Sequence, residues 1–275
     1  MDTSALNPRA EDPFRKALEK YPENVDILIP VIGRSGVGKS EFINAVLREE
    51  YGQGIKSEQL MDVQHTLRRC TVDVRLAELG RTSEGRRVVL VDTPGLIDGL
   101  DSRENEGLHV EKVANWFKEV YRTQDSAVLG GIIYLHNLAH DTLHHEDRQS
   151  LLILKALCGV KSLCRVVVAT TRWDTIKDEA SITWKLRDLE EFYGSIIKEG
   201  ATFVKENRTA REIVAMAVAK YTPGAPLQIQ QEMNEKHSSF SKTTVGSFYR
   251  EPANLKSGFN AIHTLTRRML ASLFG

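Results

Sequence analysis

The sequence predicts an α/β fold in three layers: a mainly parallel β-sheet with one antiparallel edge strand, and helices on both faces. Three observations predict it. Apolar, β-branched runs alternate with helical patterns, as they do where crossover helices connect parallel strands. The glycine-rich segment GRSGVGKS (33–40) lies between a strand pattern and a helix pattern. Two further strand patterns, separated only by a short polar turn, are close enough to pair antiparallel.

The first strand and the first helix flank the glycine-rich segment. VDILIPVIG (25–33) is a β-branched apolar run that ends at a glycine, which indicates a buried strand. KSEFINAVLREE (39–50) follows, and the spacing of its apolar residues puts them on one helical face. A strand, a loop and a helix therefore succeed one another, which is the context that a phosphate-binding loop requires.

The antiparallel pair comes next. Residues 51–70 are polar, contain two glycines and lack clear periodicity, so we interpret them as a mobile connection. In CTVDVRLAELG (70–80), Val72, Val74 and Leu76 alternate with Asp73, Arg75 and Ala77, as in a strand that is exposed on one face. After the turn at 81–87, VVLVDTPG (88–95) predicts a fully buried strand.

The remaining elements alternate as the fold requires. Strand patterns recur at 126–135, 164–171 and 201–204, and helical patterns at 110–121, 147–157, 182–198 and 210–220. After YTPGAP the chain changes character, with a helical pattern at 227–236, a Ser/Thr/Gly-rich stretch at 238–247 and an amphipathic helix at 259–274. We therefore expect an N-terminal extension (1–24), one α/β domain (25–222) and a C-terminal helical extension (223–275).

Composition excludes several classes of protein. The 275 residues contain 37 Lys plus Arg and 37 Asp plus Glu, so there is no global basic field that would attract nucleic acid, and we expect no nucleic-acid partner. No apolar run approaches the roughly 18 to 20 residues of a membrane span, and the N-terminus lacks a signal-peptide core. These features predict a soluble, cytoplasmic protein. Cys70, Cys158 and Cys164 have spacings unlike a zinc site or a disulfide framework, and we expect reduced thiols.

The glycine-rich segment matches the phosphate-loop pattern G-x-x-x-x-G-K-[ST]. In such a loop, consecutive backbone N–H groups point at the phosphates, and the following helix presents the positive end of its dipole. The glycines allow the close backbone approach, Lys39 would contact the β- and γ-phosphates, and the Ser40 hydroxyl would bind Mg²⁺. The alternative is a glycine-rich turn without a ligand. We predict a nucleotide-binding loop formed by Gly33, Arg34, Ser35, Gly36, Val37, Gly38, Lys39, Ser40 and Glu41.

A second element of the site is predicted at the end of the buried strand in VVLVDTPGLID (88–98). Asp92 follows that strand and can hold Mg²⁺ through water, while the Gly95 N–H group can donate to the γ-phosphate. A DTPG sequence alone is a modest signal. Its position some fifty residues after a phosphate loop makes it specific.

Three motifs together, GRSGVGKS, DTPG and TTRWD (170–174), carry a resemblance to a known family. The chain resembles the translation-factor-related (TRAFAC) class of P-loop GTPases and is most similar to its septin and AIG1/IMAP (Toc-like) branch. The resemblance covers about residues 25–220 and implies a G-domain fold, Mg²⁺ with GTP or GDP as ligands, and homodimers that form across the nucleotide face.

The resemblance implies that TTRWD contacts the base, in place of the usual N/T-K-x-D motif. A carboxylate at Asp174 can accept from N1–H and the exocyclic amine of guanine, whereas adenine presents an acceptor at N1. Thr171 and Arg172 complete the motif, and the flat guanidinium of Arg172 can lie over the base. Alternatively, Asp174 or Thr171 caps a helix. An altered base pocket would leave ATP and ADP as alternative ligands. We interpret Trp173 as a packing residue.

Further site residues follow from the same resemblance. Asn207 in FVKENRTAR (203–211) matches an F-x-x-x-N-R loop on the base side of the IMAP family. A threonine in the connection at 51–70 should reach Mg²⁺ and the γ-phosphate, and we choose Thr66, whose alternative is an ordinary loop residue. The predicted metal ligands are Ser40, Thr66 and Asp92.

Catalysis has the weakest sequence signal. Leu96 occupies the position after DTPG, where Ras-like enzymes have the glutamine that orients water, so intrinsic hydrolysis should be slow. His136, after a predicted strand, is a candidate inward polar or interface residue, with a structural role as the alternative. The residues predicted to act in hydrolysis are Lys39, Thr66, Gly95 and His136.

The predicted function is a slow, Mg²⁺-dependent GTPase that acts as a switch assisted by dimerization. Two alternatives stay open: an assembly module with negligible turnover, and an ATPase on the same fold.

His140 and His144 have the i, i+4 spacing of a helical metal site. They lie in a polar segment without the H-E-x-x-H form, however, and we interpret that segment as a solvated loop.

Overall fold

The computed structural model describes residues 25–52, 60–61, 73–81, 86–97, 103–123, 125–140 and 143–250. Seven strands form one sheet in the order β2-β3-β1-β5-β6-β7, and β4 also pairs with β1. The strands are β1 (Asp26–Gly33), β2 (Arg75–Arg81), β3 (Arg87–Asp92), β4 (Ala127–Leu129), β5 (Ile132–Asn137), β6 (Val166–Thr171) and β7 (Thr202–Phe203). Every pair is parallel except β2 with β3, which confirms the predicted sheet and its antiparallel edge.

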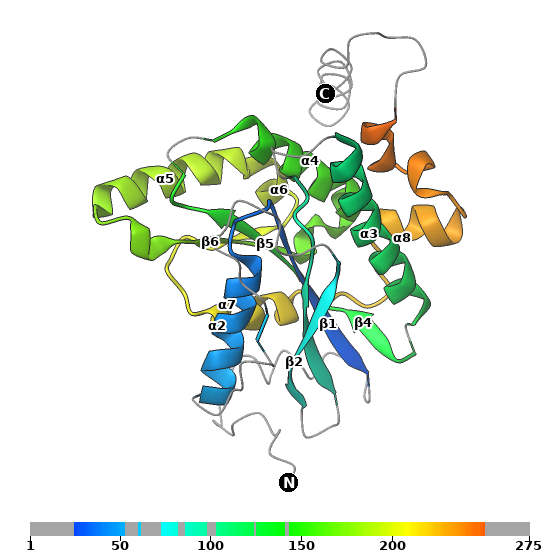
Figure 1. The fold of residues 1–275 in the computed structure, drawn as a ribbon, viewed down its shortest axis with the longest axis horizontal. Coiled ribbons are helices and arrows are strands. Elements are labelled where there is room, and N and C mark those ends of the chain that lie inside the picture. Colours follow the sequence, from blue (N-terminus) through cyan, green and yellow to red (C-terminus); the bar gives the residue numbers. More distant parts are fainter. Residues whose placement is uncertain are drawn as a thin grey trace.

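Helices cover both faces of this sheet (Figure 1). They are α2 (Lys39–Tyr51), α3 (Arg103–Arg122), α4 (His145–Cys158), α5 (Glu179–Phe192), α6 (Gly194–Lys198), α7 (Ala210–Ala219) and α8 (Gln228–Gln230). Successive residues of β1 alternate between two apolar clusters, since side chains alternate along a strand. One cluster packs the sheet against α2 and α7, and the larger one packs it against α3, α4, α5, α6 and α8. The three-layer prediction is confirmed.

The apolar face predicted for the first edge strand is only partly buried: Val74 packs against the larger cluster. Leu76 is 60% exposed, whereas Ala77 and Leu79 are buried in the cluster that also contains the inner face of α2. β2 is an edge strand, and its buried face is the one that α2 covers. Residues 70–72, with which the predicted strand began, lie outside the described part of the chain.

The strand predicted at 126–135 is two strands, β4 and β5, separated at Gly130 and Gly131. The Gly130 N–H group donates to Leu28 O of β1, while the Gly131 N–H group donates to Ala217 O at the end of α7. A Cβ atom on Gly131 would lie 2.3 Å from that oxygen. The contact with α7 therefore interrupts the strand and requires a glycine.

The helix predicted at 182–198 is also divided, into α5 and α6, at the fully buried Tyr193. The helical pattern at 227–236 becomes α8 followed by a π-helical turn, Gln231–Glu235, and 3₁₀ turns occupy part of the Ser/Thr/Gly-rich stretch. α8 lies beside α3 (Figure 1), and the larger cluster includes Leu227, Ile229, Met233, Phe240 and Val245. The main core thus continues into the C-terminal extension. The extension at 1–24 and the helix predicted at 259–274 lie outside the described residues.

Candidate functional site

The predicted phosphate loop connects β1 to α2 at the carboxyl end of the parallel strands. Gly36 and Gly38 have φ angles of 75° and 93°, in the left-handed region that side chains other than glycine rarely adopt. Gly38, the N-cap residue of α2, has no side chain that could cap the helix. The helix therefore starts with main-chain N–H groups at a glycine-lined turn, which suits an anion.

Lys39 folds back over this loop and is 7% exposed. Its Nζ atom lies 2.9 Å from Arg34 O and 3.5 Å from Gly33 O, and donates to both carbonyl groups. An ammonium group held at the mouth of the loop is in position to exchange main-chain oxygens for phosphate oxygens.

Ser40 and Asp92 meet beside the loop. The Ser40 hydroxyl donates to Asp92 Oδ2 over 2.7 Å, and Asp92 is fully buried at the end of β3. The next residue, Thr93, donates from Oγ1 to Val31 O over 2.8 Å and fastens the chain after β3 to β1. A hydroxyl and a carboxylate are hard oxygen ligands of the kind that Mg²⁺ prefers. The two described members of the predicted metal set thus fit that ion, while Thr66 lies outside the described residues.

The DTPG segment rests directly on the phosphate loop. Leu96 N donates to Gly33 O over 3.1 Å, and Ser35 N donates to Ile97 O over 2.9 Å. A Cβ atom on Gly95 would lie 2.6 Å from Ser35 N, so only glycine fits without a shift of the backbone. The Gly95 N–H contact with a γ-phosphate stays a prediction, but residues 95–97 do lie next to the loop that would hold it.

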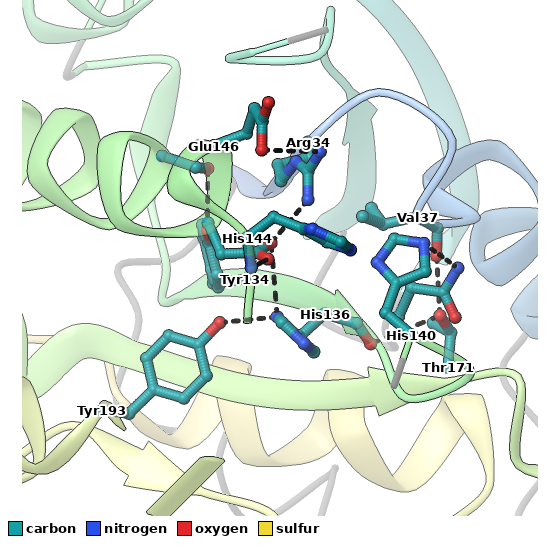
Figure 2. Close-up of polar contacts among 12 residues, drawn as sticks. Arg34, Val37, Tyr134, His136, His140, His144, Glu146, Thr171 and Tyr193 are labelled. Atoms are coloured by element: carbon teal, nitrogen blue, oxygen red, sulfur yellow. Dashed lines mark hydrogen bonds and ion pairs between the residues drawn. The ribbon is translucent and has the colours of Figure 1, made fainter. Parts of the chain in front are cut away.

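The TTRWD segment follows β6 and reaches the same edge of the sheet. Thr171 Oγ1 donates to Val37 O of the phosphate loop over 2.7 Å (Figure 2). Arg172 has a φ angle of 65°, and Trp173 packs against the larger core, with its indole N–H donating to Thr170 O over 3.1 Å. Asp174 is exposed and makes no hydrogen bond with the residues that the structure describes.

The helix-capping alternative for this motif is not observed. Asp178 caps α5, since its carboxylate accepts from Ala180 N and Ser181 N. Asp174 lies in a short 3₁₀ helix, Trp173–Thr175, that has no side-chain cap. Asn207 is exposed just before α7, and within the described chain it has no hydrogen-bond partner. Base recognition by Thr171, Arg172, Asp174 and Asn207 therefore stays a prediction.

His136 lies in a buried polar network behind the loop rather than at an open surface (Figure 2). Its Nδ1 atom lies 3.0 Å from the Tyr193 hydroxyl and 4.0 Å from Asp147 Oδ1. Burial lowers the pKa of His136 to about 4, so the ring is neutral near pH 7. A role for His136 in hydrolysis stays a prediction.

The sequence analysis placed neither Tyr193 nor Asp147 in this network, and Asp147 is the one that contacts the loop. Its Oδ1 atom accepts from Arg34 of the phosphate loop over 2.8 Å, and its Oδ2 atom accepts from His144 N over 2.8 Å. Burial opposes ionisation of this carboxyl, but the hydrogen bonds from Arg34 and His144 outweigh it and lower its pKa. Acidic residues near the start of a helix read as capping signals, so no sequence signal connects Asp147 with a loop 113 residues away.

The described residues contain no group of three His, Cys, Asp or Glu side chains that could hold a metal ion. His140 and His144 stack edge to face with ring centroids 5.5 Å apart, and α4 begins only at His145, so the two do not share a helical face. Cys158 and Cys164 are free thiols. Within the described ranges, no helix is long and apolar enough to cross a bilayer.

Comparison with known proteins places the chain in a family. A model of the AIG1 family matches residues 27–214, more than half of the chain. A dimerization-deficient variant of Toc33 from Arabidopsis thaliana matches with 14% identity and a TM-score of 0.54, over 78% of this chain and 91% of Toc33.

Two further solved structures match over the same share of this chain, 78%. Toc33 from Arabidopsis thaliana with GDP and Mg²⁺ has 14% identity and a TM-score of 0.53, and 91% of it is covered. The other structure comes from work in which dimerization is important for the GTPase activity of the chloroplast translocon components atToc33 and psToc159. It has 15% identity and a TM-score of 0.55, and 90% of it is covered. At such identities the likeness establishes the fold alone. Since the family model spans most of its α/β domain, the chain belongs to the AIG1 family and has the fold of a P-loop GTPase domain.

Proposed function

We propose that this protein binds guanine nucleotide with Mg²⁺ and hydrolyses GTP to GDP slowly, as a switch assisted by dimerization. The observation that carries the proposal is the 2.7 Å contact between Ser40 and Asp92 beside a helix N-terminus that starts at a glycine. A hydroxyl and a carboxylate that converge next to main-chain N–H groups offer oxygen ligands to a cation and donors to phosphates at the same place.

Each residue of the loop has a role in this proposal. The main-chain N–H groups of residues 36–41 bind phosphate oxygens, and Lys39 exchanges its contacts with Arg34 O and Gly33 O for contacts with the β- and γ-phosphates. Ser40 and Asp92 would hold Mg²⁺, Asp92 through water. When bound, the ion neutralises charge that develops on the phosphates.

Guanine specificity would come from Asp174. Its carboxylate is exposed and, among the described residues, has no hydrogen bond to give up, so it can accept from N1–H and the exocyclic amine of guanine. Trp173, anchored to Thr170 O, fixes the short 3₁₀ helix from which Asp174 projects. Adenine presents an acceptor at N1 and would leave the carboxylate unsatisfied.

Slow turnover follows from the residue after Gly95. Leu96 is fully buried and packs in the larger core, so nothing at this position can orient an attacking water. A second copy of the chain would supply the missing group, as dimerization matters for the GTPase activity of the chloroplast translocon components. The same burial also favours the second candidate function, an assembly module that binds nucleotide with negligible turnover.

The test is titration of nucleotide-stripped protein with GTP, GDP, ATP and ADP in Mg²⁺, with phosphate release followed at two protein concentrations. We expect guanine preference and a specific activity that rises with protein concentration. Binding with dimerization but without phosphate release would support the assembly module instead. Preference for adenine would refute the assignment of Asp174 and make the protein an ATPase.

Two variants make the test specific. Lys39→Ala should abolish binding of every nucleotide, because it removes the cation at the phosphates. Asp174→Asn should weaken GTP far more than ATP, because it replaces one acceptor of the carboxylate by a donor. Equal losses for GTP and ATP in Asp174→Asn would count against guanine specificity, and unchanged affinity in Lys39→Ala would refute the phosphate loop.

A further inference from the structure

Arg34 belongs to the phosphate loop, but its side chain leaves the loop. In Figure 2 it extends towards α4, where Glu146 lies. Arg34 Nη1 donates to Asp147 Oδ1 over 2.8 Å, and Nη2 lies 3.9 Å from Glu146 Oε2. The side chain of Arg34 is 13% exposed and that of Asp147 is 3% exposed. The main contact is thus a largely buried ion pair between the loop and a helix that begins 111 residues after Arg34.

The Asp147 carboxylate is itself held in place. Its other oxygen accepts from His144 N at the start of α4, which fixes the side chain to the helix. His136 Nδ1 of β5 approaches to 4.0 Å and is held by the Tyr193 hydroxyl at 3.0 Å. Tyr134, also on β5, donates to Ser150 of α4 over 2.7 Å. The carboxylate that accepts from Arg34 is therefore buried and held by contacts of its own.

The main chain at Arg34 connects this carboxylate to the predicted chemistry. Arg34 O is the nearer acceptor of Lys39 Nζ, at 2.9 Å. The residues on either side, Gly33 and Ser35, form the two hydrogen bonds that attach Leu96 and Ile97 to the loop. Three consecutive loop residues thus hold both the lysine and the segment that follows Asp92, and the middle one is anchored to α4.

We propose that the Arg34–Asp147 ion pair is a positioning element of the nucleotide site. It fixes the loop so that Lys39 and residues 95–97 have the positions that phosphate binding and hydrolysis require. This inference rests on the proposed function. Arg34 and Asp147 act through other groups, since Arg34 turns away from the loop interior and Asp147 lies behind it. A buried ion pair can also serve only the stability of the fold, and the test must separate the two roles.

The experiment compares Arg34→Met, Asp147→Asn and the double variant with the wild type. Asparagine at 147 keeps an acceptor for His144 N and removes the charge. The matched control is Arg87→Met, which breaks another partly buried pair, Arg87 Nε to Asp26 Oδ1 at 2.7 Å, between the amino ends of β3 and β1 and away from the loop. For each protein we measure the unfolding temperature, the Kd for GTP, GDP and ATP in Mg²⁺, and the kcat of GTP hydrolysis.

We expect each single variant to raise the Kd for GTP and GDP and to lower kcat by between about 10-fold and 10²-fold, because small misplacements of binding groups have effects of that size. The ratio of GTP to ATP affinity should not change, since the base is read elsewhere. Arg34→Lys keeps the charge and should recover part of the affinity. Arg87→Met should lower the unfolding temperature and leave the Kd unchanged.

The double variant separates the two roles. Removing both partners leaves no uncompensated buried charge, so the unfolding temperature should recover towards the wild-type value. A positioning role predicts that nucleotide affinity does not recover with it. The inference fails if affinity recovers in parallel with stability, or if the single variants lose stability but keep the wild-type Kd and kcat. Either result would leave the proposed function intact. A wild-type protein that binds no nucleotide would overturn the proposed function as well.

Discussion

Replacing Gly95 by alanine tests whether the segment after Asp92 rests on the phosphate loop as described. The added Cβ atom would lie 2.6 Å from Ser35 N, 2.8 Å from Ser35 Cα and 2.9 Å from Ser35 Cβ. Two of these atoms are backbone, so the contact cannot be relieved by a side-chain rotation. Either the loop or residues 95–97 must move by several tenths of an ångström or more.

These contacts set the size of the loss in the free energy of unfolding. Overpacking a dense interior costs about 1–3 kcal/mol. The movement also strains the hydrogen bonds from Leu96 N to Gly33 O and from Ser35 N to Ile97 O, each of which contributes about 0.5–1.5 kcal/mol. For a domain of this size, 1 kcal/mol corresponds to about 2–4 °C in Tm, so we expect Tm to fall by at least several degrees.

Thermal unfolding and nucleotide titration check this prediction together. Gly194→Ala is the matched control, because a Cβ atom there meets nothing within 4 Å and the residue begins helix α6, where alanine is favoured. Gly95→Ala should unfold at lower temperature than the control and bind GTP more weakly. A Gly95→Ala protein with the Tm and the Kd of the control would refute the close packing of residues 95–97 on Ser35.

Three further predictions follow from other parts of the molecule. Ser40→Ala removes the hydroxyl that donates to Asp92, so nucleotide binding should lose most of its dependence on Mg²⁺ in titrations with and without the ion; an unchanged dependence would remove Ser40 from the metal site. Gly131→Ala would put a Cβ atom 2.3 Å from Ala217 O, and we expect it to destabilise the fold by about 3 kcal/mol or more in denaturant unfolding, whereas a neutral result would contradict the contact between the β4–β5 break and α7. The folded pKa of His136, about 4, lies below its ordinary value of 6.5, so the unfolded chain binds more protons between these values and the free energy of unfolding should fall as pH falls through that window, by up to about 3 kcal/mol. His136→Gln should flatten this slope in unfolding series between pH 4.5 and 7, and an unaltered slope would show that another group titrates.

The sequence by itself determined most of the strands and helices and the position of the glycine-rich loop between β1 and α2. The period of the apolar residues identified the strands and helices, because burial of one face imposes that period. The glycines of the loop and the lysine and serine after them follow a local pattern, since the backbone conformation they adopt and the groups they present depend on adjacent residues. The family resemblance drew on the same local motifs, and the AIG1 match confirmed it.

Only the tertiary structure decided the features that depend on distant residues. Whether Leu76 or Ala77 is buried depends on which face of the edge strand α2 covers. The break at Gly131 depends on the end of α7, and the partner of Arg34 lies 113 residues away on α4. The segment from Leu227 to Val245 joins the main core because α3 and α4 present an apolar surface to it. Local periodicity indicates that a face is buried. Which element buries it depends on packing between elements, and no short stretch of sequence contains that information.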